Sequence, residues 1–316
     1  MSDVMVPMTG APAGALATLA DSARAYSESA KAAATLRGYR SDWRGFTAWC
    51  AERGFDPLPA GPETVALYIS DLAGVRATAT IARHLTAIAE AHKRMGHESP
   101  TAHPAVREVH RGIRRTFGTA HNHKQALETH DVRAMVRHLA GRPMDVRDRA
   151  LVLIAFMAAL RRSELVALNV DDVAFVPEGL EITVRRSKTD QEGVGEVLGV
   201  PYASDPTCCP VRALRAHLDS SGIVEGAIFR SMRHGERLSG RAAAARIKRL
   251  AAKIGHDPER VGGHSTRRGF ITSAAKAQVH ERDIMRHSRH CSIVVFRSYI
   301  EQANLWTDNA AVSVGL

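Results

Sequence analysis

The spacing of apolar side chains constrains the fold of this chain more than any other feature. Apolar residues recur every three or four positions along most of the sequence. The clearest stripe lies in the segment 34–50 and consists of Leu36, Tyr39, Trp43, Phe46 and Cys50. This is the period of an amphipathic α-helix. Alanine, the strongest helix former, is abundant, and aromatic residues make up only 5% of the chain. We therefore expect a mainly α-helical protein.

One region has a different period. Leu180, Ile182 and Val184 alternate with polar residues, and glycines at 193 and 195 separate them from a second apolar segment, 197–200. A period of two on either side of a glycine-containing turn predicts a β-hairpin, with Lys188 on its turn side. Helical patterns surround the hairpin, at residues 128–140, 146–160, 210–219, 239–254, 264–277, 280–287 and 292–301.

The chain is long enough for two domains, and its periodicity divides it accordingly. Residues 1–11 are small and contain proline and glycine, which predicts a flexible N-terminus. Residues 12–118 are helical throughout, with further helices at 78–95 and 103–117. The polar segment 119–126 has no apolar period and is typical of a linker. Residues 127–316 then form the second predicted domain, which is mostly α with one small sheet.

The charge of the chain favours a polyanionic partner. The formal net charge is +10, of which +7 falls on residues 123–316. Nucleic acid is the first candidate and an anionic membrane surface the second. No apolar run is long enough to span a membrane, and the N-terminus lacks the pattern of a secretion signal. The cysteines form no C-x-x-C pair, which fits a reducing cytosol. We expect a cytoplasmic protein, associated with the nucleoid.

Several arginines of the N-terminal helices are candidates for contacts with DNA phosphates. Three of them follow the same helical spacing within the segment 34–50, for which a solvated surface is an equally good interpretation. The others lie in the predicted helices 78–95 and 103–117. The candidates are Arg37, Arg40, Arg44, Arg83, Arg114 and Arg115.

Four short motifs carry a family resemblance. They are Leu160-Arg161-Arg162-Ser163-Glu164-Leu165, Ser187-Lys188-Thr189, His264-Ser265-Thr266-Arg267-Arg268, and His290 with Tyr299 nine positions later. Together and in this order they resemble the tyrosine recombinase (phage integrase) family. The run 209–214 and the segments 299–301 and 309–311 also resemble its bacterial integrases. Each motif alone is weak, but the ordered set is specific and covers nearly the whole chain with the helical N-terminal half.

The resemblance implies a fold and an activity. The fold would be a helical, SAM-like core-binding domain and a mostly α catalytic domain with a small antiparallel β-sheet, which together form a C-shaped clamp on DNA. The activity would be site-specific recombination that integrates, excises or resolves a mobile element or replicon. No ATP, metal or other cofactor is expected. The partners would be a double-stranded DNA site and further copies of the chain, in dimers and a tetrameric synaptic complex, joined through the tail Ala310–Leu316. The alternative for this tail is packing on its own domain.

The resemblance also assigns roles. Arg161 and Arg267 would clamp the scissile phosphate, and Tyr299 would attack it to form a 3′-phosphotyrosyl bond. Lys188 would protonate the leaving 5′ oxygen, and His264 would act as general base or phosphate contact. His290 would donate a further hydrogen bond, and Glu164 would support the pocket.

These residue types suit the chemistry. A free phenol has a pKa near 10, so its proton must be removed. Arginine offers paired hydrogen bonds to phosphate oxygens, and histidine exchanges protons near neutrality.

Some positions depart from the family pattern or leave alternatives open. Ala159 stands where glycine is usual, a mild change, and Ser288-Arg289 stand where Leu-Gly is usual, so the turn before His290 cannot use the freedom of glycine. His287 lies twelve residues before Tyr299, which is the wrong spacing for the active histidine. Lys188 could be an ordinary turn lysine. Two other functions are a type IB topoisomerase and a DNA-binding factor on a degenerate recombinase scaffold, although none of Arg161, Arg267 and Tyr299 is missing.

Overall fold

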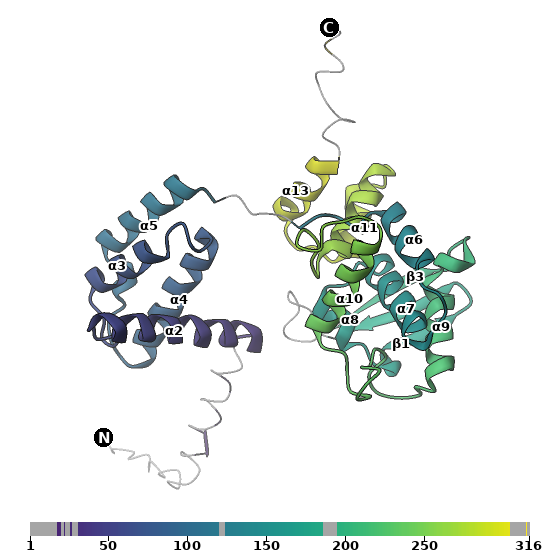
Figure 1. The fold of residues 1–316 in the computed structure, drawn as a ribbon, viewed down its shortest axis with the longest axis horizontal. Helices are drawn as coiled ribbons and strands as arrows, with labels where there is room; N and C mark the ends of the chain where they lie inside the picture. Colours follow the sequence, from purple (N-terminus) through teal and green to yellow (C-terminus); the bar gives the residue numbers. More distant parts are fainter. Residues whose placement is uncertain are drawn as a thin grey trace, which may run out of the picture. The chain divides into compact units, whose positions relative to one another are not determined.

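The computed structural model describes residues 31–119, 124–185 and 195–303, together with residues 18, 19, 22, 26 and 314. The chain divides into two compact units, Met1–Asn122 and His123–Leu316. Figure 1 colours both along the sequence. The described parts are mainly helical, with one three-stranded antiparallel sheet, so the predicted fold class is confirmed.

The first unit is entirely helical in its described part. Its helices are α2 (Ala33–Arg53), α3 (Pro62–Leu72), α4 (Thr78–Arg94) and α5 (Pro104–Phe117), with a 3₁₀ turn at Pro100–Ala102. Helix α2 packs along α4 and α3 along α5 (Figure 1). Phe46 and Cys50 from the predicted stripe are fully buried, next to Tyr68, Ile81 and other apolar side chains. The stripe therefore forms the core face of α2, as its spacing indicates.

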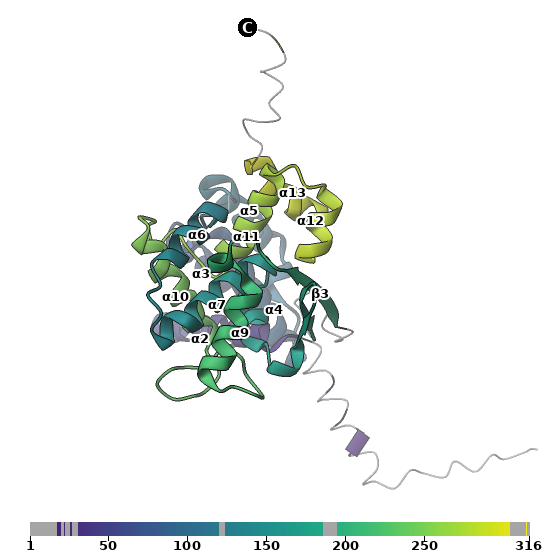
Figure 2. The same cartoon turned by 90° about the vertical axis from the view of Figure 1, so that its right-hand side faces the viewer.

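The second unit contains the remaining elements. Its helices are α6 (Thr129–Arg137), α7 (Pro143–Met157), α8 (Arg162–Ala167), α9 (Pro210–Ser221), α10 (Gly240–Lys253), α11 (Ser265–Lys276), α12 (Glu281–Ser288) and α13 (Ile293–Ala303), with 3₁₀ turns at Val170–Asp172 and Pro206–Cys208. Helix α7 is buried along most of its length and packs against α9 and α11. Helices α12 and α13 lie beside α11 (Figure 2). None of the helices within the described ranges is long and apolar enough to cross a membrane.

The sheet has the order β1-β2-β3, with strands β1 (Val173–Val176), β2 (Gly179–Val184) and β3 (Glu196–Pro201). Strands β2 and β3 pair in antiparallel register from Gly179–Pro201 to Val184–Glu196, which confirms the predicted hairpin. Leu180, Ile182 and Val184 are buried, as their alternation requires. Strand β1 was not predicted, because four residues are too few to establish a period. The turn of the hairpin, with Lys188, lies outside the described residues.

The chain enters the second unit in close contact with α11. The backbone N–H of Leu127 donates to the carbonyl of Ser265 at 3.0 Å, and the N–H of Gln125 donates to the carbonyl of Arg260 at 2.6 Å. Opposite this segment, Gly269 has no room for a side chain, since a Cβ there would lie 1.6 Å from the carbonyl oxygen of Leu127. This close approach aligns the start of α11, which carries part of the candidate site.

Candidate active site

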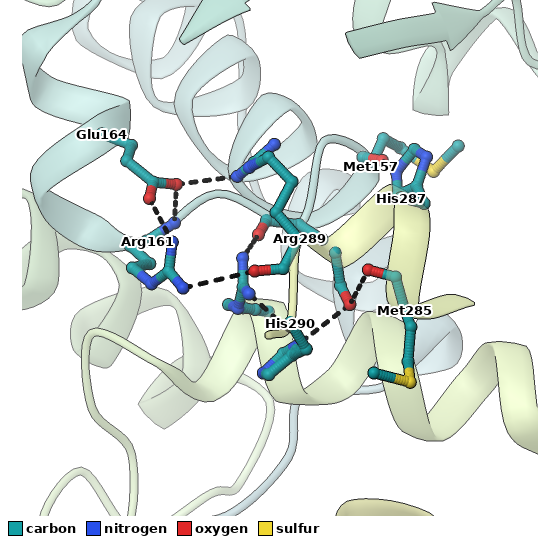
Figure 3. Close-up of polar contacts among 10 residues, drawn as sticks. Met157, Arg161, Glu164, Met285, His287, Arg289 and His290 are labelled. Carbon is teal, nitrogen blue, oxygen red and sulfur yellow. Dashed lines mark hydrogen bonds and ion pairs between the residues drawn. The ribbon is translucent and has the colours of Figure 1, made fainter. Parts of the chain in front are cut away.

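The candidate site lies where three segments of the second unit meet. They are the turn 158–161 between α7 and α8, the start of α11, and the turn 289–290 between α12 and α13. Arg161 and Glu164 of the first motif and His290 of the fourth meet here (Figure 3), and Arg267 of the third motif contacts Ala159 and His290. The contacts join positions more than one hundred residues apart in the chain, such as Arg161 and Arg289.

Glu164 anchors the first part of the site. Its side chain accepts a hydrogen bond from the backbone N–H of Arg161 at 2.9 Å and from Nη1 of Arg161 at 2.6 Å. A second guanidinium, that of Arg289, donates from Nη2 to the same carboxylate at 2.7 Å. Burial raises the pKa of the Glu164 carboxyl, but Arg289 and Arg161 outweigh this effect and hold the pKa below its ordinary value. Glu164 is therefore an ionised, shared acceptor (Figure 3).

Arg267 forms the second part. It is in the first turn of α11 and is 4% exposed. Its Nη1 donates to the carbonyl of Ala159 at 2.6 Å, and its Nη2 lies 3.2 Å from Nδ1 of His290. Burial and the charge of Arg161 lower the pKa of Arg267 to about 9, which still leaves the guanidinium charged at neutral pH. Arg267 thus connects the turn after α7 to His290.

The partner of His290 determines its tautomer. A guanidinium can only donate hydrogen bonds, so Nδ1 of His290 must be the acceptor and Nε2 carries the proton. The hydroxyl of Ser288 also lies 2.8 Å from Nδ1. Burial, followed by Arg267 and Arg161, lowers the pKa of His290 to about 3. His290 is therefore neutral at physiological pH and suited to donate a hydrogen bond from Nε2, not to act as an imidazolium acid.

Tyr299 lies on α13 beside this histidine. The two rings are 5.8 Å apart between centroids and inclined at 64°. On another side, the guanidinium carbon of Arg268 is 5.4 Å from the centre of the Tyr299 ring. The ring also packs against the small cluster of Ile271, Ile284 and Phe296. Arg268 stands next to Arg267 in the third motif, and its contact with Tyr299 had no signal in the sequence.

His287 has partners of a different kind. Its Nε2 lies 2.7 Å from the carbonyl oxygen of Met157, and its ring is stacked on Phe270 with centroids 4.6 Å apart. Burial lowers its pKa. These contacts join α12 to the end of α7, so the geometry gives His287 a structural role and places His290 with the arginines (Figure 3).

Two further candidates from the sequence are His264 and Lys188. His264 directly precedes the first residue of α11, is exposed, and lies three positions before Arg267 in the chain. Lys188 lies outside the described residues, and its role stays a prediction.

The arginine candidates of the first unit fall into two groups. Five of them are exposed on α2 and α5: Arg37, Arg40, Arg44, Arg114 and Arg115. Arg83 on α4 is different, because its Nε and Nη2 donate to the buried carboxylate of Asp42 at 2.6 and 3.0 Å. His84 Nε2 lies 3.4 Å from the same carboxylate and its Nδ1 2.8 Å from the hydroxyl of Tyr68. Arg83 thus braces α4 against α2 within the unit, an ion pair with no sequence signal.

Similarity to known proteins confirms the family that the ordered motifs indicate. Residues 125–305 match the model of the phage integrase family. The chain belongs to the phage integrase family. An integrase/recombinase XerD homologue of Selenomonas ruminantium is 38% identical over 297 residues, which cover 90% of this chain and 86% of the relative.

Solved structures of phage integrase and Xer-type recombinases have the same fold. XerH bound to a palindromic difH substrate superimposes with a TM-score of 0.62 at 15% identity, over 79% of this chain and 71% of that one. A lambda integrase (75-356) dimer bound to a COC′ core site gives a TM-score of 0.59 at 17% identity, over 92% and 96% of the two chains. At 15–17% identity, the likeness to these structures shows the fold alone.

Proposed function

We propose that this chain is a site-specific DNA recombinase that cuts and rejoins double-stranded DNA through a 3′-phosphotyrosyl intermediate, with Tyr299 as the nucleophile. Membership of the phage integrase family supports the activity. The observation that carries the assignment to this site is the contact of Tyr299 with His290, which Arg267 holds in turn. The phenol therefore lies beside a buried cluster of positive charge.

The charge balance of this cluster suits a phosphodiester. Among the described side chains, Arg161 and Arg289 both pair with one carboxylate, that of Glu164, and the same carboxylate acts on the nearby Arg267 through its charge. Burying an excess of positive charge is costly unless an anion compensates it. A phosphate held by Arg161 and Arg267 would supply that compensation, and charged donors gain strength at a site from which water is excluded. The charge that builds up on phosphorus oxygens in the transition state would be stabilised in the same way.

The steps follow from the groups at hand. The Tyr299 oxygen loses its proton and attacks phosphorus, the bond to the 5′ oxygen breaks, and that oxygen takes up a proton. We assign the proton to Lys188, and we assign His264 as general base or phosphate contact. Neutral His290 donates from Nε2 to a phosphate oxygen, and Glu164 holds Arg161 in place. The energy of the broken bond is kept in the phosphotyrosine, so the reverse reaction rejoins the strand without ATP.

Contacts to the DNA backbone are proposed for the arginines of the first unit. Arg37, Arg40 and Arg44 recur at intervals of three and four along α2 and are exposed, so one face of the helix can follow phosphates. Arg114 and Arg115 are exposed at the end of α5. The Arg83 guanidinium is engaged by Asp42, so we propose that any phosphate contact of Arg83 uses the edge that this pair leaves open. A clamp of both units around the duplex stays a prediction.

We further propose self-association on DNA, into dimers and a tetrameric synaptic complex, and a cytoplasmic location at the nucleoid. The tail Ala310–Leu316, proposed to dock on a neighbouring copy, lies outside the described residues apart from Val314. Deletion of residues 308–316 should abolish cooperative assembly on a two-site duplex and leave binding to a half-site intact. Unchanged cooperative assembly would exclude docking through the tail.

The central test is covalent capture. The protein is incubated with a library of nicked duplexes whose central sequence is random. The mixture is then denatured, and the DNA that stays covalently linked to protein is isolated and sequenced. The wild type should attach to a defined sequence through Tyr299, and Tyr299→Phe should bind the recovered duplex without attachment. Attachment that persists in this variant refutes Tyr299 as nucleophile. Attachment without sequence preference, with relaxation of any plasmid, would indicate a type IB topoisomerase, and binding without attachment a DNA-binding factor.

A further inference from the structure

Arg289 has an environment that an incidental surface arginine would not have. It directly precedes His290 and adopts a left-handed backbone conformation, with φ 55° and ψ 49°. Its side chain is only 3% exposed. Glycine adopts this conformation without strain, whereas an arginine there is strained and its charge is taken out of water. Both costs fall on the residue next to the active-site histidine.

Arg289 contacts Glu164 through its side chain and Arg161 through its main chain. Its Nη2 donates to Oε2 of Glu164 at 2.7 Å, and its main-chain carbonyl lies 3.4 Å from Nη2 of Arg161. Figure 3 shows the side chain reaching from the turn back to Glu164, with its carbonyl directed at Arg161. The Nε and Nη1 atoms of Arg289 are buried and have no hydrogen-bond partner in the described structure. The guanidinium is thus held by Glu164.

The single negative charge of Glu164 is therefore shared between two cations, Arg161 and Arg289. The carboxylate of Glu164 meets Nη1 of Arg161 on one oxygen, and Nη2 of Arg289 and the N–H of Arg161 on the other. With Arg161 alone, the pair would be close to neutral and would attract a phosphate weakly. With Arg289 added, the three groups carry a net positive charge, and Arg161 retains its attraction for an anion.

We propose that Arg289 is a positioning residue of DNA cleavage. It shares Glu164 with Arg161, keeps the positive charge of Arg161 available for the scissile phosphate, and holds the turn that presents His290. This inference rests on the proposed function of the site and adds to it a third guanidinium, at the position where glycine is usual in the family.

The first arm of the test needs no DNA. The carboxyl ¹³C signal of Glu164, identified by its loss in Glu164→Gln, is followed against pH in the full-length wild type, Arg289→Met, Arg289→Gly and Arg289→Lys. The charged and titratable groups around Glu164 are Arg161, Arg267, Arg289 and His290. Loss of one close cation should move the midpoint of Glu164 upward by about 1–3 pH units in the Met and Gly variants. Lysine should keep it near the wild-type value. An unchanged midpoint in both neutral variants overturns the proposal.

The second arm measures the rate of covalent attachment on a duplex that the wild type attaches to. Arg289→Met and Arg289→Gly should slow attachment by about 10- to 100-fold and leave affinity for the same duplex close to that of the wild type. Lysine should restore part of the rate. The Gly variant relieves the strained backbone, so it answers the question if Arg289→Met fails to fold.

The two arms separate the possible failures. A raised midpoint with an unchanged attachment rate shows a shared carboxylate that does not serve cleavage, and it overturns the proposal. Slow attachment that lysine does not improve, with affinity lost in parallel, indicates only a damaged fold and also overturns it. If the wild type attaches to no duplex, the proposed function fails and the role of Arg289 in cleavage fails with it, whereas the Glu164 titration still reports whether the carboxylate is shared.

Discussion

Replacement of Glu164 by glutamine should strongly destabilise the second unit. Glu164 is 4% exposed and accepts three hydrogen bonds, two from Arg161 and one from Arg289. Glutamine removes the charge and turns one acceptor oxygen into an N–H₂ donor that faces other donors. Removal of one partner from a buried ion pair costs about 3–5 kcal/mol, because the remaining charge stays buried without compensation.

The expected loss for Glu164→Gln is near the lower end of that range. Hydrogen bonds to charged groups contribute about 1.5–3 kcal/mol each, and an amide oxygen at the position of Oε2 can keep two of the three. We therefore expect a loss of about 3–4 kcal/mol in the free energy of unfolding. Domains are commonly stable by about 5–15 kcal/mol, so the variant should still fold and its loss should be measurable.

The assay is urea unfolding followed by hydrogen–deuterium exchange and mass spectrometry. Peptides from α7, α8 and α11 report the second unit by itself, which matters because two units need not unfold together. The matched control is Glu259→Gln, since Glu259 pairs with Lys248 at 3.2 Å but its side chain is 84% exposed. An exposed pair contributes about 0–1 kcal/mol. If Glu164→Gln costs no more than this control, the buried network does not stabilise the unit and the reasoning is refuted.

Three further predictions concern His290, Ala159 and the arginines at the end of α5. The pKa of His290 falls from 6.5 to about 3 on folding, so as pH decreases through this window the unfolded chain takes up a proton there and the folded chain does not. The free energy of unfolding should therefore become smaller as the pH falls through this window. His290→Asn should reduce this dependence of the free energy on pH, measured by urea titrations at several pH values. An unaltered dependence would contradict a neutral His290. Ala159 has φ 44°, so Ala159→Gly should increase the free energy of unfolding by about 0.5–1 kcal/mol and raise the melting temperature accordingly. A lower melting temperature would mean that the backbone at Ala159 is not strained. Arg114→Gln and Arg115→Gln should each lower the slope of log affinity against log salt by about 0.9, measured by anisotropy on any duplex, and an equal slope would exclude phosphate contact.

The sequence predicted the local structure well, because local structure depends on neighbours three or four positions away. The stripe from Leu36 to Cys50 forms the buried face of α2, and the alternation of Leu180, Ile182 and Val184 forms β2. The short elements β1 and α8 were missed, since four and six residues carry too little period to be seen. The order of the motifs also identified the family, which similarity to known proteins then established.

The two positions where glycine is usual show the limit of sequence reasoning. Ala159 and Arg289 both adopt positive φ, at 44° and 55°. In the sequence, Ala159 was a mild change and Arg289 meant that the turn before His290 could not use the freedom of glycine. The structure nevertheless keeps the left-handed conformation at both positions. Ala159 directs its carbonyl to Arg267, and Arg289 directs its carbonyl to Arg161. Arginine contacts made in this conformation offset the strain, and no local pattern reports them.

The sequence by itself determined which segments become helices or strands, where positive charge gathers, and which chemistry a phenol with ordered arginines and histidines can perform. Only the tertiary structure decided which charges meet. It paired Arg289 with Glu164 across 125 positions, gave His290 rather than His287 to Arg267, and engaged Arg83 with Asp42. The physical reason is that helix period is set within one turn of the chain, whereas the partner of a buried charge is set by the packing of distant segments around it.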